Sequence, residues 1–207
     1  MAENDLTGGS KFPDDTSASI KDVRPSDDDD DDVDPETEAF VASINQTELS
    51  SLASSLRKGQ PCKVGERLQG AFNVLFHIHF NDGVTWLARF PLPQCPSLRM
   101  KSEIATMKYV KERTKIPIPE VYAYDLSSNN PIGAPYMLMN KLPGEMLGCK
   151  WDSLSHELKR KILHQIVEIL IELSTHRFPQ IGSLVLDDSG EFKIGELCRH
   201  PQHCLQL

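Results

Sequence analysis

The sequence has 207 residues, 39% of them hydrophobic, with 22 basic and 30 acidic side chains and a formal net charge of −8. Residues 1–38 hold 14 acidic and 3 basic residues, a net of −11, so residues 39–207 carry −8 + 11 = +3. This balance excludes nucleic-acid binding driven by bulk charge, and no apolar run reaches the roughly 18 residues of a membrane span. The length suits one domain, or one small lobe with part of another.

The cysteines and the N-terminus predict a location. Five cysteines are an odd, scattered set without a CxxC pair, which favours neither a zinc site nor a disulfide framework. Such a set is typical of a reducing compartment. Residues 1–10 are polar and acidic, unlike a secretory or mitochondrial presequence. We therefore expect a cytoplasmic protein that binds neither nucleic acid nor membrane.

The first 38 residues are predicted to be a disordered acidic tail, because a segment this polar cannot bury enough apolar surface to fold. The run Asp27–Asp32 is interpreted as a solvating segment, with docking to a basic partner as the alternative. Apolar residues spaced by three and four then predict a helix over Glu38–Leu56. Gly59 and Pro61 are expected to end it.

A β-hairpin is predicted next. Apolar residues alternate over Ala71–Phe80, which indicates a half-buried strand. Asn81–Gly83 is a typical hairpin turn, since Asp and Gly tolerate the backbone angles required. The second strand is expected over Val84–Phe90.

The remaining elements are predicted from the same signals. We expect a helix, two strands, a long amphipathic helix and a second hairpin, in this order: Ser97–Thr114, Glu120–Tyr124, Pro135–Met139, Ser153–His176, and Leu184–Leu186 with Phe192–Ile194 around Asp187–Gly190. This order is the layout of the small nucleotide-binding lobe of a kinase-like fold, followed by the start of its large lobe.

Three residues are candidates for a phosphate-binding site, two that could contact phosphate and one that could orient the cation. A glycine such as Gly70 allows backbone amides to approach phosphate oxygens, although it also suits a simple strand entry. Arg89 lies within an apolar strand, where a cation is costly unless it is paired. Glu103 on the following helix is its natural partner. The alternative is that Arg89 reaches solvent at a sheet edge and Glu103 lies on a solvated helix face.

Three segments of the sequence are similar to the aminoglycoside phosphotransferase family of small-molecule kinases, in its fungal branch. They are GAFNVLFHIHFNDGVTWLARFPLP, SEIATMKYVKERTKIPIPEVYAYDLSSNNPIGAPYMLMNKLPG and FPQIGSLVLDDSGEFKIG, and the resemblance covers about residues 50–195. It implies an α+β, protein-kinase-like fold. The small lobe would span residues 39–142, and residues 143–207 would form an incomplete large lobe.

The resemblance also implies a function for particular residues. The donor would be ATP or GTP and the acceptor a hydroxyl of a small molecule. Gly70 and Asn73 match the phosphate-covering loop, Arg89 the strand cation and Glu103 the helix carboxylate. Asn140, Lys141 and Leu142 match the hinge, whose backbone would bind the purine. The family often has an acidic residue where Asn140 stands, which matters little if recognition there uses the backbone.

The catalytic half of the family pattern is not found. No histidine is followed two residues later by Asp, as the catalytic loop requires. After Gly144 the aspartates are Asp152, Asp187 and Asp188, which do not match the family's magnesium ligands. Cys198, His200, His203 and Cys204 match no zinc motif. We therefore predict no catalytic and no metal-binding residue in this chain.

Two functions remain open from the sequence. One is a phosphotransferase whose catalytic half is missing from the sequence, and the other is a non-catalytic module that binds a nucleotide or a protein partner. A truncated gene model, a degenerate paralogue and a genuine short protein are all compatible with the sequence. A weaker third hypothesis is an interaction protein that acts through the acidic tail. The apolar stripe of Ser153–His176 further predicts self-association, since exposed apolar surface favours it.

Overall fold

The computed structural model describes residues 34–94 and 97–197, with no side-chain detail for Ser97 and Leu98. The chain divides into two units, Met1–Val33 and Asp34–Leu207, and all described residues belong to the second. The Asp27–Asp32 run and the cysteine–histidine segment after residue 197 lie outside the described residues. None of the described helices has the length and hydropathy needed to cross a membrane.

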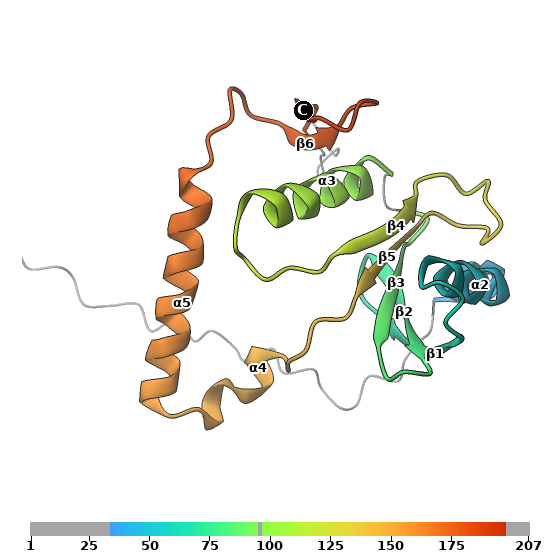
Figure 1. The fold of residues 1–207 in the computed structure, drawn as a ribbon, viewed down its shortest axis with the longest axis horizontal. Coiled ribbons are helices and arrows are strands. Elements are labelled where there is room, and N and C mark those ends of the chain that lie inside the picture. The colour runs from blue at the N-terminus through green and yellow to red at the C-terminus, as the bar shows by residue number, and fades with distance from the viewer. Residues whose placement is uncertain (1–33, 95–96, 198–207) are drawn as a thin grey trace, which may run out of the picture. The chain divides into compact units, whose positions relative to one another are not determined.

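A five-stranded antiparallel sheet is the centre of the fold (Figure 1). Its spatial order is β1-β2-β3-β5-β4, built from Cys62–Gln69, Asn73–Phe80, Thr85–Pro91, Tyr136–Asn140 and Val121–Asp125. The helices are α1 (Pro35–Ser43), α2 (Gln46–Leu56), α3 (Ser97–Arg113), α4 (Leu147–Lys150) and α5 (His156–Thr175). A separate hairpin, β6 (Ser183–Leu186) with β7 (Phe192–Gly195), follows α5. The predicted α+β class is confirmed.

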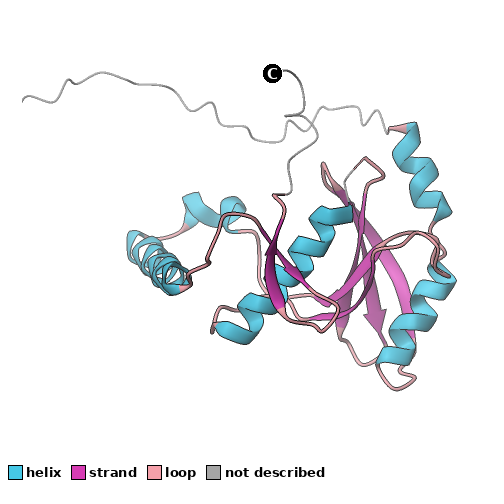
Figure 2. Cartoon of the chain, turned by 90° about the horizontal axis from the view of Figure 1, so that it is seen from above, coloured by secondary structure: helices cyan, strands magenta, loops and turns pink. Residues whose placement is uncertain are grey.

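Helices cover both faces of the sheet (Figure 2). On one face, Leu49 and Ala53 of α2 are fully buried against Val74, Ile78 and other apolar residues of the central strands. On the other face, α3 contributes a smaller core, which consists of Met100, Ile104, Met137 and Met139 with their half-buried neighbours. Strand side chains alternate between the faces, so every second residue of β2 and β3 points to α3.

The first predicted helix is in fact two helices. Asn45 interrupts it: its side-chain Oδ1 accepts hydrogen bonds from the backbone N–H groups of Thr47 and Glu48 and so caps α2. The helix α1 begins at Pro35, inside the predicted acidic tail. The carboxylate of Asp34 caps it through Glu36 N–H, and a proline suits the first helical position.

Strand β1 was not predicted from the sequence. Its segment CKVGERLQ lacks apolar alternation because β1 is an edge strand that pairs only with β2 and is largely exposed. The register with β2 shifts between Val64 and Arg67, which indicates a bulge at Gly65 and Glu66. The other predicted strands and helices are confirmed within a few residues at each end.

Candidate functional site

The side chains of Arg89 and Glu103 meet on the α3 face of the sheet. Guanidinium Nη1 of Arg89 donates to Oε1 of Glu103, and the two form an ion pair. The side chains are 21% and 32% exposed, so both charges are partly withdrawn from water and their attraction is stronger than on an open surface. The predicted pairing is therefore confirmed over the alternative of two solvated charges, while a role in nucleotide binding stays a prediction.

The turn between β1 and β2 lies beside this pair. Gly70 N–H donates to the carbonyl of Asn73 at 2.9 Å and closes the turn. Asn73 and Phe72 line a hollow of about 10 Å³ together with Arg89 and Glu103. The turn predicted to cover phosphates and the predicted cation are thus neighbours. The hollow is too small for a phosphate group, which would have to bind at its mouth.

Gly70 is not required by the turn itself. A Cβ atom at this position would find its nearest contact, the carbonyl oxygen of Asn73, at 3.8 Å, which is an ordinary van der Waals distance. Its φ angle is not positive either. Any need for glycine at residue 70 therefore has to come from a ligand that approaches the backbone.

Arg99 on α3 is a neighbour of this site that the sequence did not indicate. Its guanidinium carbon lies 4.6 Å from the ring centroid of Phe72, a cation–π contact that joins the start of α3 to the turn. Both residues line the same hollow as Arg89. A second cation therefore stands beside the predicted phosphate site.

The backbone of the predicted hinge is partly occupied. Asn140 N–H donates to the carbonyl of Glu120 at 3.2 Å, and Lys141 N–H donates to the carbonyl of Thr85 at 3.2 Å. The Asn140 side chain accepts a further hydrogen bond from Glu120 N–H at 2.6 Å. Within the described part of the chain, Leu142 N–H has no backbone acceptor. Of the three predicted hinge residues, Leu142 is the one with an available N–H donor.

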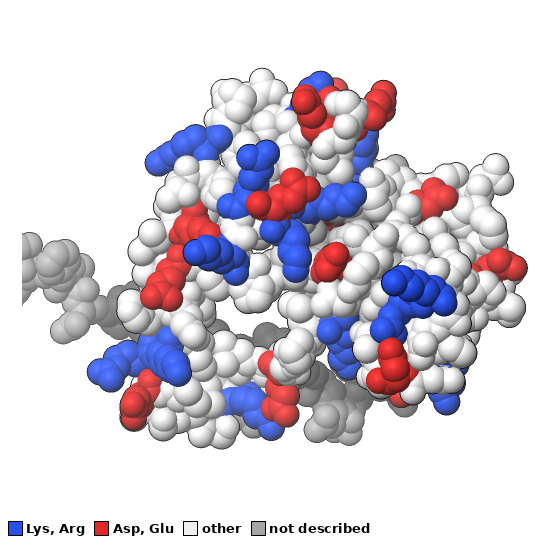
Figure 3. All heavy atoms as spheres, viewed as in Figure 1, with Lys and Arg blue, Asp and Glu red and all other residues white. Residues whose placement is uncertain are grey.

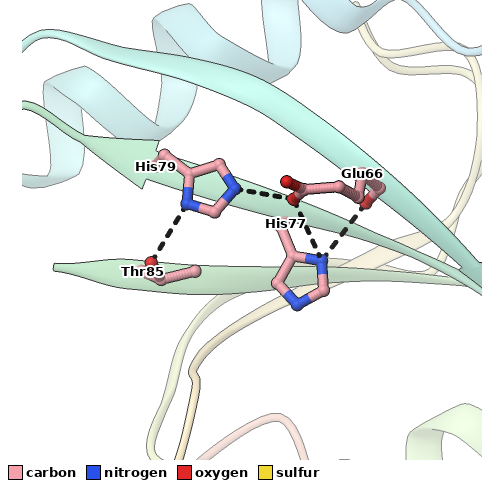
Figure 4. Close-up of polar contacts among 4 residues, drawn as sticks. All are labelled: Glu66, His77, His79 and Thr85. Atoms are coloured by element: carbon pink, nitrogen blue, oxygen red, sulfur yellow. Dashed lines mark hydrogen bonds and ion pairs between the residues drawn. The ribbon is translucent and has the colours of Figure 1, made fainter. Parts of the chain in front are cut away.

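A polar cluster near the hinge was also missed (Figure 4). Nε2 of His79 and Oε2 of Glu66 are 2.8 Å apart, and Nδ1 of His79 lies 3.2 Å from the hydroxyl of Thr85. His77 Nδ1 lies 3.3 Å from the backbone carbonyl of Glu66, and the two imidazoles stack in parallel. The hydrogen bond from His79 lowers the pKa of Glu66 below its ordinary value. This cluster ties the edge strand β1 to β2 and β3.

No magnesium site is found within residues 34–94 and 97–197, where no three acidic, histidine or cysteine side chains are placed to hold a metal ion. Asp187 is engaged in its own turn. Its Oδ1 accepts hydrogen bonds from Ser189 N–H, the Ser189 hydroxyl and Glu191 N–H, and its Oδ2 pairs with Lys193. Lys193 and these donors hold the pKa of Asp187 far below its ordinary value. Its carboxylate therefore serves the hairpin and does not fit the magnesium role.

Basic side chains lie over α3 on the face that Figure 3 shows. The helix sequence SLRMKSEIATMKYVKER contains five Lys and Arg residues against two Glu. This surface flanks the Arg89–Glu103 pair, and its positive charge would attract an anion.

Comparison with known proteins decides the family. A family model described as the phosphotransferase enzyme family matches residues 66–197, which include four strands of the sheet and the end of β1, together with α3, α5 and the second hairpin. The chain belongs to this family. A GDP complex of a mutant aminoglycoside 2′-phosphotransferase-IIIa superposes with a TM-score of 0.50 at 21% identity, over 64% of this chain and 42% of that chain. The fold of this phosphotransferase-family chain is therefore the kinase-like fold that the resemblance implied.

Fungal relatives extend the comparison. A subtelomeric hrmA-associated cluster protein of Aspergillus fumigatus is 37% identical over 58% of this chain and 24% of its own length. The altered inheritance of mitochondria protein 9 of Candida albicans is 28% identical over 74% of this chain and 26% of its own length. The chain thus spans about a quarter of the length of these relatives.

The expected cytoplasmic location is contradicted by these comparisons. Relatives from Candida albicans and Candida dubliniensis, 27–28% identical, are named mitochondrial proteins. The expectation rested on the polar, acidic residues 1–10 and on a scattered set of cysteines, a pattern that indicates a reducing compartment without telling which one.

Proposed function

We propose that this chain contains the nucleotide-binding small lobe of a phosphotransferase, over residues 39–142, and that residues 143–207 begin its large lobe. The observation that carries the proposal is the Arg89–Glu103 pair beside the Gly70–Asn73 turn. In phosphoryl transfer a lysine or arginine held by a helix carboxylate is a recurring means of orienting nucleotide phosphates. GDP in a structure of the same fold is consistent with this use.

Each residue of the site would have a distinct task. Glu103 holds the guanidinium of Arg89 in place, and the remaining N–H groups of that guanidinium would face the α- and β-phosphates. Arginine supplies five donors in a fixed planar arrangement, so one can bind Glu103 while others bind phosphate. Backbone N–H groups between Gly70 and Asn73 would cover the phosphates, and Leu142 N–H would bind the purine. The donor would be ATP or GTP.

The complete reaction needs metal ligands that the described residues do not supply. By family, the acceptor would be a hydroxyl of a small molecule, and the structurally similar phosphotransferase is named for aminoglycosides. The described residues contain no set of side chains placed to bind magnesium, which phosphate transfer would require. We expect the 207-residue chain by itself to bind nucleotide weakly, with little enhancement by magnesium, and to transfer no phosphate. We further propose that the protein acts in mitochondria, for which its Candida relatives are named.

The second candidate function is a non-catalytic module that binds a nucleotide or a protein partner. It is favoured by the engagement of Asp187 in its turn, which leaves the described residues without a metal-ligand set. The first candidate requires both nucleotide binding and phosphate transfer, whereas the second requires no transfer and, where its ligand is a protein partner, no nucleotide binding.

Titration of the full chain with fluorescent ATP and GTP analogues, with and without magnesium, tests the proposal. Arg89→Met should weaken binding at least about ten-fold, because it removes charge-assisted hydrogen bonds worth roughly 1.5–3 kcal/mol. Arg160→Met, at an exposed position on α5, is the matched control and should change nothing. Equal affinity in Arg89→Met and the unaltered chain would overturn the site. Transfer of labelled phosphate to amino-sugars or choline by the chain would overturn the expected inactivity.

A further inference from the structure

Helix α3 is held from two sides. Met100 and Ile104 pack against the sheet, in the core shared with Met137 and Met139. A different face of α3 contacts β6 of the second hairpin (Figure 1). This face lines a cleft of about 550 Å³ together with residues of the loop and the hairpin after α5. The position of α3 on the sheet therefore depends on segments that follow α5 as well as on the sheet.

Tyr109 contacts these later segments through both its hydroxyl and its ring. Its hydroxyl lies 2.9 Å from Nδ1 of His176, the residue that caps α5, 67 positions later in the sequence. Its ring packs against the rings of His176, Phe178 and Phe192, with centroids 5.4, 5.4 and 5.2 Å away. Aromatic pairs at such distances stabilise by about 0.5–1.5 kcal/mol each beyond their buried area.

Tyr109 shares this task with other residues of α3, which also contact β6. Tyr109 lines both the 550 Å³ cleft and a second one of about 800 Å³, so open space lies close to its side chain. Near the end of α3, Lys115 N–H donates to Oε1 of Glu172 at 2.9 Å and adds one hydrogen bond to α5. Removing the Tyr109 side chain would delete the hydroxyl contact to His176 and the three ring contacts, and would so loosen this face of α3.

The geometry of the helix links Tyr109 to the nucleotide site. Glu103 is six residues before Tyr109 on the same helix, about 9 Å along the axis and about 120° around it. Tyr109 therefore points to the hairpin while Glu103 points to Arg89. A helix of this length moves as a rigid body, so a shift of α3 at Tyr109 displaces the carboxylate of Glu103 relative to β3.

We infer that Tyr109 is a positioning residue, which fixes α3 to His176, Phe178 and Phe192 and thereby keeps Glu103 in register with Arg89. The inference rests on the proposed function, in that the Arg89–Glu103 pair is taken to bind nucleotide phosphates. It assigns the β6–β7 hairpin and the end of α5 a part in nucleotide binding, although none of their residues touches the predicted phosphate site.

A double-mutant cycle on the full chain tests the coupling. Tyr109→Ala and Glu103→Gln should each weaken ATP binding about five-fold or more, the lower end of typical coupling between sites. The double variant should bind no more weakly than Glu103→Gln alone, because Tyr109 acts through Glu103. Tyr109→Phe keeps the three ring contacts and should restore most of the affinity. Additive losses in the double variant would overturn the inference.

Amide hydrogen exchange gives a readout that needs no nucleotide. Tyr109→Ala should speed exchange over residues 97–113 and leave residues 73–80 unchanged, while Lys111→Ala, an exposed change on the same helix, should alter neither. If the unaltered chain binds no nucleotide, the proposed function fails, and this exchange alone decides whether Tyr109 holds α3. Unchanged exchange over residues 97–113 in Tyr109→Ala would reject the anchor.

A second variant perturbs the hairpin without touching α3. A Cβ atom at residue 182 would collide with the carbonyl oxygen of Gly195 and lie 2.5 Å from the Ile194 side chain, so Gly182→Ala must open the hairpin. It should reproduce both effects of Tyr109→Ala. If Tyr109→Ala does not fold, Phe192→Leu removes one of the three rings and is judged by the same two measurements. Unaltered affinity and exchange in these variants would count against the inference.

Discussion

Arg89 and Glu103, 14 residues apart in the sequence, are joined by an ion pair beside the apolar core that α3 forms with the sheet. The register of β3 places Arg89 opposite Leu75 in β2 and Met137 in β5. An arginine between two apolar side chains has few other partners. Glu103 therefore stabilises the partly buried charge of Arg89 whether or not a ligand is bound.

Breaking the pair on one side should destabilise the fold. Glu103→Met leaves the guanidinium of Arg89 partly buried without a partner, and we expect a loss of about 1–3 kcal/mol. The double variant Arg89→Met with Glu103→Met should recover part of this loss, since two apolar side chains can replace a partly buried pair. Urea unfolding measures the free energy of unfolding of the single and the double variant. A double variant less stable than Glu103→Met would contradict the explanation.

Gly65→Ala should destabilise the sheet edge. A Cβ atom there would lie 2.5 and 2.6 Å from ring atoms of His79, so the imidazole would be driven off Glu66. We expect a loss of about 1–3 kcal/mol, as for overpacking elsewhere. Gly148→Ala is the control, because a Cβ at that position meets nothing within 4 Å. Adding His79→Ala to Gly65→Ala should restore stability, and thermal unfolding that shows no restoration would refute the collision.

The hydrogen bond from His79 should make stability depend on pH through Glu66. Its pKa is lower in the folded chain than the ordinary value of 4.5. A carboxyl whose pKa is depressed by folding stabilises the fold above the ordinary value, and this contribution is lost as pH falls through the folded pKa. Stability measured from pH 6 downward should therefore fall below about pH 4.5 more steeply in the unaltered chain than in Glu66→Gln. Parallel curves would show that Glu66 does not titrate in this way.

Leu49→Ala should be among the most destabilising changes. The side chain of Leu49 is fully buried between α2 and the sheet, and its truncation leaves a cavity. Leucine-to-alanine changes at such sites cost about 2–5 kcal/mol. Leu56→Ala on the same helix, where the side chain is 43% exposed, should cost far less. Chemical denaturation measures the free energy of unfolding of both variants. Similar losses in the two would show that Leu49 is not part of the core.

The apolar side chains of α5 should cause self-association. None of its residues is buried, and Leu170 and Ile171 are 59% and 60% exposed. We expect the chain to sediment as dimers or larger species, and Leu170→Lys with Ile171→Lys to shift it toward monomer. Glu168→Lys, a change at a charged position of α5, is the control and should leave association unchanged. A monodisperse monomer of the unaltered chain would show that α5 is not a contact surface.

Most elements were predictable because their signals are local. Alternating apolar residues specified β2 and β3, the Asn81–Gly83 turn specified their pairing, and three-four spacing specified α3 and α5. Strand β1 was missed, since this largely exposed edge strand, interrupted by a bulge, has no regular apolar pattern to detect. The break at Asn45 was missed because the apolar spacing continues across it, and capping by a side chain changes no periodicity.

The sequence by itself determined which residues could carry charge to a nucleotide, since Arg89 stands in an apolar strand and Glu103 on the next helix. Only the tertiary structure decided that the two meet, that Lys141 N–H is engaged with Thr85, and that Tyr109 contacts His176. The physical reason is that these are contacts between segments distant in the chain. The geometry of these contacts follows from the register of the sheet and from how the helices pack on the sheet. Neither can be predicted from the local amino-acid composition.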